Sequence, residues 1–158
     1  MDLNQQQESQ TRTLEQDNII YSINYEDNTA SIIELHPTMY EIIIPRSINY
    51  ESTEYTITSI LEKSIQSPNI KSIQFPLDSE LQTIEKNAFY YSKIERFTIP
   101  SSLTDLKEGW CDCVSYLNQV NVSPNNPRYK KYDDKMIIGK HNEQDAEYTD
   151  LKTMNSMF

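Results

Sequence analysis

Residues 81–103 read LQTIEKNAFYYSKIERFTIPSSL, and this stretch decides the fold because its apolar pattern recurs on both sides of it. It opens with an apolar-x-x-apolar step from Leu81 to Ile84, and the same step begins again at Leu103, 22 residues later. An earlier copy begins at Ile57, 24 residues before Leu81. A fixed period of roughly 20 to 50 residues marks a repeat architecture, so the period outranks local secondary-structure signals.

Each of the three units then ends in an alternating apolar pair and a proline. These residues are Ile73, Phe75 and Pro76 in the first unit, Phe97, Ile99 and Pro100 in the second, and Val120, Val122 and Pro124 in the third. A unit of about 23 residues lies in the range of leucine-rich repeats, in which each unit adds a short strand and a return segment to a stack. The sequence therefore predicts a mainly β leucine-rich-repeat solenoid with short turns or single helical turns.

The alternating pairs mark the strands of one parallel sheet. Side chains along a strand point alternately to its two faces, so the apolar positions turn inward and the positions between them turn outward. The outward positions form two neighbouring rows, with Gln74, Thr98 and Asn121 in one and Ser72, Arg96 and Gln119 in the other. We expect a partner protein to bind this face.

A further copy of the strand-plus-proline pattern, EIIIP, precedes the three units at residues 41–45. Aligning Ile42 and Ile44 with the inward pair puts Ile43 in the outward row that continues with Gln74. A solvent-facing Ile is either a contact residue for a partner or is covered by neighbouring chain. We expect the N-terminal cap to cover Ile43, and we keep Ile43 as a candidate partner-binding residue.

The second unit resembles the BspA-type leucine-rich repeat, whose pattern is I-x-x-x-A-F-x-x-C-x-x-L-x-x-I-x-I-P-x-S. Ala88-Phe89 stands on the A-F pair, residues 99–102 stand on I-P-x-S, and Ser92 stands at the Cys position. Residues 125–138 are similar to the N-x-x-Y-x-x-x-D-G-x-L-Y step that commonly follows such repeats, with Asp134-Lys135 in place of D-G. The resemblance covers roughly residues 19–140 and implies a surface antigen or adhesion-related protein.

The chain outside the three repeats divides into four further segments. The first 17 residues are Gln-rich and nearly devoid of apolar side chains, so little burial is available to offset the entropy of ordering them. Residues 19–25 and 30–35 have strand composition around an Asp-Asn turn, which predicts a capping hairpin. The expected organisation is 1–17 disordered, 18–56 β-rich cap, 57–124 three repeats, 125–140 C-terminal capping segment and 141–158 acidic tail.

The eleven tyrosines are a second candidate for recognition. Tyr combines an apolar ring with a polar tip, which favours it at binding surfaces. Tyr90, Tyr91 and Tyr116 fall in return segments, where they can pack. We expect most of the tyrosines to serve structural packing.

Composition excludes several classes of partner. The 158 residues hold 14 Lys and Arg against 24 Asp and Glu, a net charge of −10, whereas nucleic-acid binding depends on clustered cations. Two glycines are too few for a Gly-rich nucleotide loop. No run approaches the roughly 18 apolar residues that a membrane helix requires. We expect a protein partner, no nucleic acid, no membrane insertion and no cofactor, and the oligomeric state stays open.

The side chains that carry chemistry predict no catalytic or metal site. His36 and His141 lack partners at metal-ligand spacing. A nucleophilic pair would need His36 in the cap to reach Cys111 or Cys113 in the last repeat, although a solenoid unit contacts only its neighbours. We expect a non-catalytic protein-binding or adhesion module. The alternatives are a structural or truncated repeat protein without a dedicated partner and, less favoured, an enzyme with an unrecognised site.

The expected location depends on which observation is used. The polar, acidic N-terminus is unlike a secretory signal, and Cys111 and Cys113 cannot form a disulfide framework, which together favour the cytoplasm. The family resemblance implies the cell surface. The location therefore stays open at this point.

Overall fold

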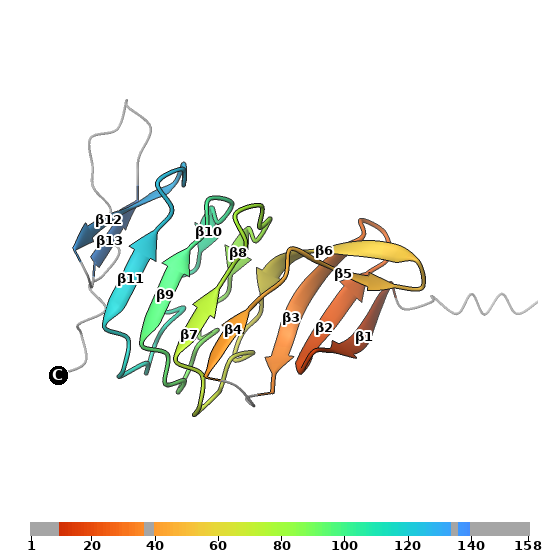
Figure 1. Ribbon diagram of the computed structural model, residues 1–158, viewed down its shortest axis with the longest axis horizontal. Helices are drawn as coiled ribbons and strands as arrows, with labels where there is room; N and C mark the ends of the chain where they lie inside the picture. Colours follow the sequence, from red (N-terminus) through yellow and green to blue (C-terminus); the bar gives the residue numbers. More distant parts are fainter. Residues whose placement is uncertain (1–9, 37–39, 134–135, 140–158) are drawn as a thin grey trace, which may run out of the picture.

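The computed structural model describes residues 10–36, 40–133 and 136–139. Within these ranges the fold is a β solenoid without helices (Figure 1). Its front ladder consists of four parallel strands in the order β11-β9-β7-β4. They are β4 (Glu41–Ile43), β7 (Ser72–Gln74), β9 (Arg96–Ile99) and β11 (Gln119–Val122). The predicted, mainly β repeat solenoid and its parallel strand stack are confirmed, and its return segments are turns.

A second ladder runs along the back of the solenoid, and the sequence analysis did not foresee it. It is formed by β6 (Thr53–Ile60), β8 (Thr83–Ile84) and β10 (Asp105–Leu106), which pair in parallel. The apolar-x-x-apolar step at the start of each unit supplies these strands. β8 and β10 have only two residues each, which is too short for an alternation of apolar and polar residues to be recognised in the sequence.

Antiparallel strands close the N-terminal end. They are β1 (Thr11–Gln16), β2 (Ile19–Asn24) and β3 (Thr29–Leu35), with β3 joined in parallel to β6 and β5 (Ser47–Tyr50) antiparallel to β6. The predicted capping hairpin is therefore present as β2 and β3. The expectation of disorder over residues 1–17 is wrong for Thr11–Gln16, and residues 1–9 lie outside the described residues.

Strand β1 forms although four of its six residues are exposed and only Leu14 adds an apolar side chain that packs against the core. Its stabilisation comes from backbone pairing with β2 in full register, from Thr11 opposite Asn24 to Gln16 opposite Ile19. The turn between them is made by Asp17 and Asn18, whose φ angles of 53° and 63° lie in the left-handed region that two-residue hairpins use. An apolar count alone could not reveal a strand held in this way.

The core lies between the two ladders and follows the predicted apolar columns. The aromatic members form its centre, because the Phe89 ring lies 5.1 Å from that of Phe97 and 5.3 Å from that of Trp110. Trp110 also lies 5.3 Å from Phe97 and is 7% exposed. Phe75 and Val122 are only partly buried, although they pack against this core.

The return segments are turns, and they stack through their backbones. Lys63, Asn87 and Gly109 occupy equivalent places in successive units, with φ angles of 56°, 56° and 76°. The Lys63 amide donates to the Asn87 carbonyl at 3.1 Å, and the Asn87 amide donates to the Gly109 carbonyl at 2.9 Å. A left-handed residue is thus part of the repeat, although three different residue types fill the position.

The C-terminal hairpin consists of β12 (Tyr129–Asp133) and β13 (Met136–Gly139), which pair antiparallel. The hairpin is therefore present although Asp134-Lys135 replaces the expected D-G; those two residues lie outside the described residues. The acidic tail at 141–158 also lies outside them. Asn126 joins the hairpin to the last repeat through side-chain bonds to the carbonyls of Pro100 and Leu103.

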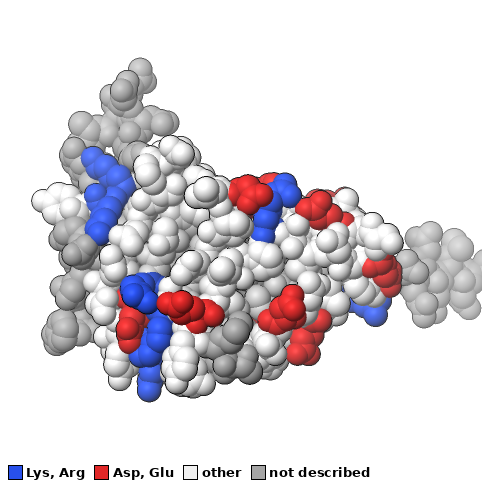
Figure 2. All heavy atoms as spheres, viewed as in Figure 1, with Lys and Arg blue, Asp and Glu red and all other residues white. Residues whose placement is uncertain are grey.

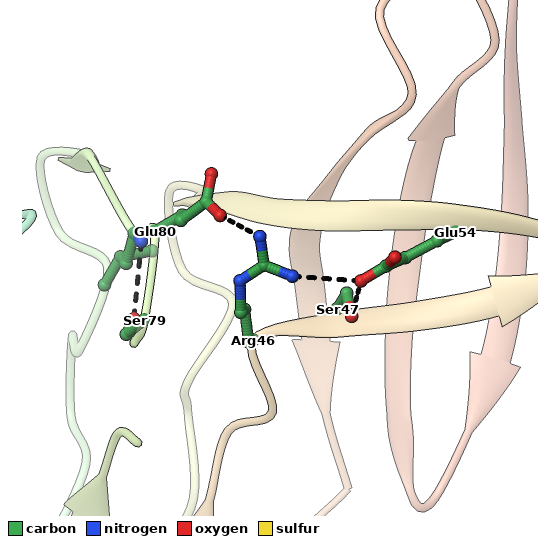
Figure 3. Close-up of polar contacts among 6 residues, drawn as sticks. Arg46, Ser47, Glu54, Ser79 and Glu80 are labelled. Atoms are coloured by element: carbon green, nitrogen blue, oxygen red, sulfur yellow. Dashed lines mark hydrogen bonds and ion pairs between the residues drawn. The ribbon is translucent and has the colours of Figure 1, made fainter. Parts of the chain in front are cut away.

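An arginine bridge connects the N-terminal cap to the repeats (Figure 3). The Arg46 guanidinium, just after β4, donates to Glu54 of β6 at 3.0 Å and to Glu80 in the turn before β8. The hydrogen bond to Glu80 raises the pKa of Arg46 above its ordinary value. Ser47 also donates to Glu54, at 2.6 Å. These contacts fix the segment that follows β4 against β6 and against the turn before β8.

The expectation that most tyrosines pack is wrong for half of those described. Five of the ten described tyrosines are largely exposed, and they are Tyr25, Tyr40, Tyr91, Tyr116 and Tyr132. Three are buried, namely Tyr21, Tyr55 and Tyr129. The exposed ones lie mostly in turns, and some still contact a neighbour, as Tyr25 does with Tyr55 and Tyr91 with Tyr90.

Candidate functional site

A hollow of about 520 Å³ lies on the outward face of the front ladder and extends across all four of its strands. We call this face the strand face and this depression the hollow. Its lining combines outward residues of the strands with the turns that follow them, and comprises Glu41, Ser72, Gln74, Phe75, Pro76, Leu77, Arg96, Thr98, Pro100, Ser101, Asn121 and Ser123. Its volume lies in the range of about 300–1,000 Å³ that is typical of ligand sites.

Strand register explains why these side chains meet. Glu41, Ser72, Arg96 and Gln119 are paired in sequence across the ladder and form one row. Ile43 is paired with Gln74, and Thr98 with Asn121, in the next outward row. Neighbouring strands lie about 4.8 Å apart, so residues from four different repeats lie side by side. The two rows predicted from the sequence are therefore present.

Arg96 and Glu41 form an ion pair that spans the strand between them. The Arg96 guanidinium lies 3.2 Å from the Glu41 carboxylate, and both side chains are more than half exposed. Ser72 lies between them in the row, and it is only 6% exposed. The expectation that Ser72 faces solvent is therefore wrong, because two longer side chains meet above it.

Gln74 and Thr98 form the open floor of the hollow, since both are exposed. Asn121 is partly buried because the Lys131 ammonium donates to its side-chain oxygen at 3.1 Å. Five of the seven residues predicted for partner binding line the hollow, and they are Ser72, Gln74, Arg96, Thr98 and Asn121. The other two, Gln119 and Ile43, do not line it.

Ile43 is 67% exposed, so the expectation that the cap covers it is wrong. Strand β4 lies at the edge of the front ladder, whereas the cap strands continue the back ladder through β3 and β6. The cap therefore extends one sheet and leaves the outward side of the other open. Ile43 remains an accessible apolar residue next to the hollow.

The sequence analysis missed the residues in the turns that border the hollow. Leu77 is the most prominent of them, because its side chain is fully exposed, with a relative exposure of 101%. Pro100 and Ser101 occupy the corresponding turn of the next unit. A signal was available, since a proline closes each strand in the sequence and equivalent turns of a solenoid stack on one another.

The residues considered for catalysis do not form a site. His36 follows β3 at the N-terminal end and lies 3.7 Å from Glu34, whereas Cys111 and Cys113 lie just before β11 at the other end (Figure 1). Burial, with a smaller contribution from the Asp112 carboxylate, raises the pKa of the Cys111 thiol to about 12. A thiol with so high a pKa is a poor nucleophile.

The described residues provide neither a metal site nor a membrane-spanning helix. In those ranges, no group of three or more His, Cys, Asp or Glu side chains is arranged to hold a metal ion. The same ranges contain no helix long and apolar enough to cross a membrane.

Comparison with known families agrees with the repeat geometry. The pattern described as "BspA type Leucine rich repeat region (6 copies)" matches residues 38–133, which is more than half of the chain. This protein belongs to the BspA-type leucine-rich repeat family. Proteins of this family are typically non-catalytic repeat proteins. The match begins just before β4 and ends with β12, so this BspA-type array includes every strand of the front ladder.

The chain is also similar to several solved structures. One from Bacteroides capillosus is 19% identical, with a TM-score of 0.47, and the match covers 70% of this chain and 98% of that one. A leucine rich cell surface protein from Faecalibacterium prausnitzii is 11% identical, with a TM-score of 0.34 and coverage of 82% and 59%. The pneumococcal vaccine antigen PcpA is 16% identical, with a TM-score of 0.38 and coverage of 82% and 54%.

This BspA-type chain thus spans just over half the length of the last two proteins. At these TM-scores the similarities add nothing to the assignment, which rests on the repeat itself. Among curated proteins, none matches this sequence.

Proposed function

We propose that this protein is a non-catalytic binding module and that the hollow on the strand face receives a partner protein. One observation carries the proposal: a single depression across four strands is lined by five residues that the repeat pattern had assigned to the outward rows. Concave sites with convergent polar groups are the usual places for recognition.

The construction of the hollow suits recognition rather than chemistry. Its floor comes from strands, which hold side chains at fixed spacing, and its border comes from turns closed by proline. Amide and hydroxyl groups of Gln74, Thr98 and Ser101 can donate and accept hydrogen bonds without a charge. A rigid, preformed surface of this kind loses little conformational entropy on binding.

The experiment places a photo-crosslinking amino acid at Thr98 and, as a matched control, at Glu108. Thr98 lies in the floor of the hollow, whereas Glu108 is an exposed residue of a return segment outside it. Crosslinking in whole cells should yield a defined partner from position 98 and not from position 108. The partner is then purified, and its Kd is measured by calorimetry.

Replacing Gln74 and Thr98 together with Ala should weaken that Kd about tenfold or more, which corresponds to about 1.4 kcal/mol. Glu108→Ala should leave the Kd within a factor of two, and both variants should keep the wild-type melting temperature because the replaced side chains are exposed. An unchanged Kd for the double variant, with loss of binding on substitutions elsewhere, would show that the hollow is not the site.

We further propose that this binding serves adhesion at a cell surface, and family membership supports this step. Surface biotinylation of intact cells, followed by fractionation, tests it directly. Recovery of the protein in the labelled fraction is the expected result. Recovery with unlabelled cytoplasmic proteins would contradict the adhesion proposal but would not contradict the proposal that the hollow binds a partner.

A further inference from the structure

We infer that the hollow receives an extended, uncharged peptide segment with one apolar side chain, and that Glu41 sets this preference by neutralising Arg96. The inference rests on the proposed function and names the kind of partner segment for the same site. Three features of the hollow carry it: its lack of net charge, its hydrogen-bonding groups and its exposed leucine.

The charge of the hollow differs from that of the molecule. The chain carries a net charge of −10, yet Glu41 and Arg96 are the charged residues of the lining, and they are paired at 3.2 Å. In Figure 2 the centre of this face is white, with charged side chains of both signs along its lower edge, where the strands begin, and Lys or Arg side chains at its upper left, over the C-terminal strands. Within the lining, an acidic or basic segment would lose hydration without finding an unpaired opposite charge. The Lys131 ammonium lies outside the lining and donates to the side-chain oxygen of Asn121.

Glu41 is the residue that creates this neutrality. Without its carboxylate, the Arg96 guanidinium would present free donors in a concave site, and guanidinium groups bind carboxylates in a bidentate geometry. The carboxylate therefore occupies a position that an Asp or Glu of a ligand would otherwise take. The same pair covers Ser72, so it also forms part of the floor against which a ligand packs.

The uncharged groups around the pair match a peptide backbone. Gln74 and Thr98 on the floor, with Ser101 and Ser123 in the lining, offer neutral donors and acceptors. Three gaps of about 4.8 Å separate the four strands, so a segment that crosses them covers about 14 Å, which is four to five residues at about 3.3 Å each. Such a segment fits the extent of the hollow.

The apolar anchor is inferred from Leu77. Its side chain is fully exposed beside the hollow, and an apolar group of the ligand that covers it would remove both surfaces from water. The aromatic residue of the lining, Phe75, is partly buried and packs edge-on against Phe97 with centroids 5.9 Å apart. The lining therefore offers a sugar ring only one, partly buried aromatic ring to stack on, which favours a peptide over a glycan.

The test uses a bead-displayed library of random octapeptides with acetylated and amidated ends, so that only side chains carry charge. It is sorted against the whole wild-type chain and against four variants: Glu41→Gln, Arg96→Gln, the double variant of the two, and Glu108→Gln. Glu108→Gln makes the same charge change outside the hollow. Enriched peptides are then measured by fluorescence anisotropy at low and high salt.

The wild type should enrich peptides with zero net charge and a Leu, Ile or Met, and their Kd should change less than twofold with salt. Glu41→Gln should enrich acidic peptides and bind them at least tenfold more tightly than the wild type does, in a salt-sensitive way. Arg96→Gln should favour basic peptides, the double variant should return to neutral ones, and Glu108→Gln should match the wild type. Leu77→Ser should remove the apolar preference.

Enrichment of charged peptides by the wild type overturns the inference, as does a Glu41→Gln variant that selects the same peptides as the wild type. Binding to a glycan array with no peptide enriched also overturns it. In these cases the proposed function still holds if replacing Gln74 and Thr98 weakens binding of the crosslinked partner. If that double replacement also leaves the Kd of the partner unchanged, the hollow is not a binding site and both proposals fail.

Discussion

Replacement of Asn126 by Ala should detach the C-terminal hairpin from the last repeat. Asn126 is 1% exposed. Its amide donates to the carbonyls of Pro100 and Leu103 at 2.7 and 2.9 Å, and its oxygen accepts from the backbone amides of Arg128 and Tyr129 at 2.8 and 2.7 Å. These four bonds use both donors and both lone pairs of the side chain.

The four bonds set the size of the effect. At about 1 kcal/mol of net stabilisation per hydrogen bond, their loss costs about 4 kcal/mol. The full desolvation penalty does not apply to each group, because the Pro100 carbonyl keeps a bond from the Leu103 amide and Arg128 is exposed. A cost of about 4 kcal/mol is a large share of the roughly 5–15 kcal/mol that stabilises a typical domain.

Thermal unfolding and hydrogen exchange together measure this cost. At about 2–4 °C per kcal/mol for a chain of this size, the melting temperature should fall by roughly 8–16 °C. Because a solenoid is stabilised by contacts between neighbouring units, amides of β12 and β13 should lose protection first, while those of β2 and β3 keep it.

Asn125→Ala is the matched control, because Asn125 is exposed next to the buried residue. It should change stability by less than about 0.5 kcal/mol. Equal, small effects of the two substitutions would refute the reasoning.

Asn126→Asp adds a pH test: its carboxylate would face two carbonyl oxygens, so its folded pKa would lie above the unfolded value of about 3.9. Stability relative to wild type should therefore recover as pH falls from 7 to 4 and be lost as pH rises.

Three further predictions concern the repeats. Lys63→Gly should stabilise the fold by about 0.5–1 kcal/mol in urea titrations because φ is 56° there, whereas Lys63→Val should destabilise it. The buried Ser92 hydroxyl has no hydrogen-bond partner among the described residues, so Ser92→Ala should be neutral or stabilising by about 1 kcal/mol. Ser64→Ala is the control: it removes the 2.7 Å hydrogen bond from the Ser64 hydroxyl to the Leu61 carbonyl and should cost about 1 kcal/mol. In a Cys113→Ser background, native Cys111 should be alkylated at pH 8.5 at least about 100-fold more slowly than in urea, since its pKa of about 12 exceeds the ordinary value of about 8.5. The same shift means that its contribution to stability is present below about pH 8.5 and falls as pH rises towards 12.

Most of the fold could be predicted from apolar spacing. The columns at 22 and 24 residues located the solenoid, its front strands and its core residues such as Phe89 and Ile99. Two features were beyond that method. Strand β1 is paired along its whole length with β2 and places a single apolar side chain, Leu14, against the core, and the two-residue strands β8 and β10 are too short to show a period.

The candidate site was predicted in part. The period of 2 along each strand placed Gln74, Thr98 and Asn121 on the outward side, and all three line the hollow. The same reasoning treated every outward residue as equally accessible. Ser72 is covered by the Glu41–Arg96 pair, whose partners are 55 residues apart in sequence.

The sequence by itself determined that this chain is a repeat solenoid and which side chains leave water, because a recurring apolar stripe has to be buried in the same way in every unit. Only the tertiary structure decided which outward side chains remain open and where the surface is hollowed. Accessibility depends on side chains from different repeats that meet over a strand, as Glu41 and Arg96 do, and on turns that expose a residue such as Leu77. Those contacts arise from the stacking of units, which local spacing does not specify.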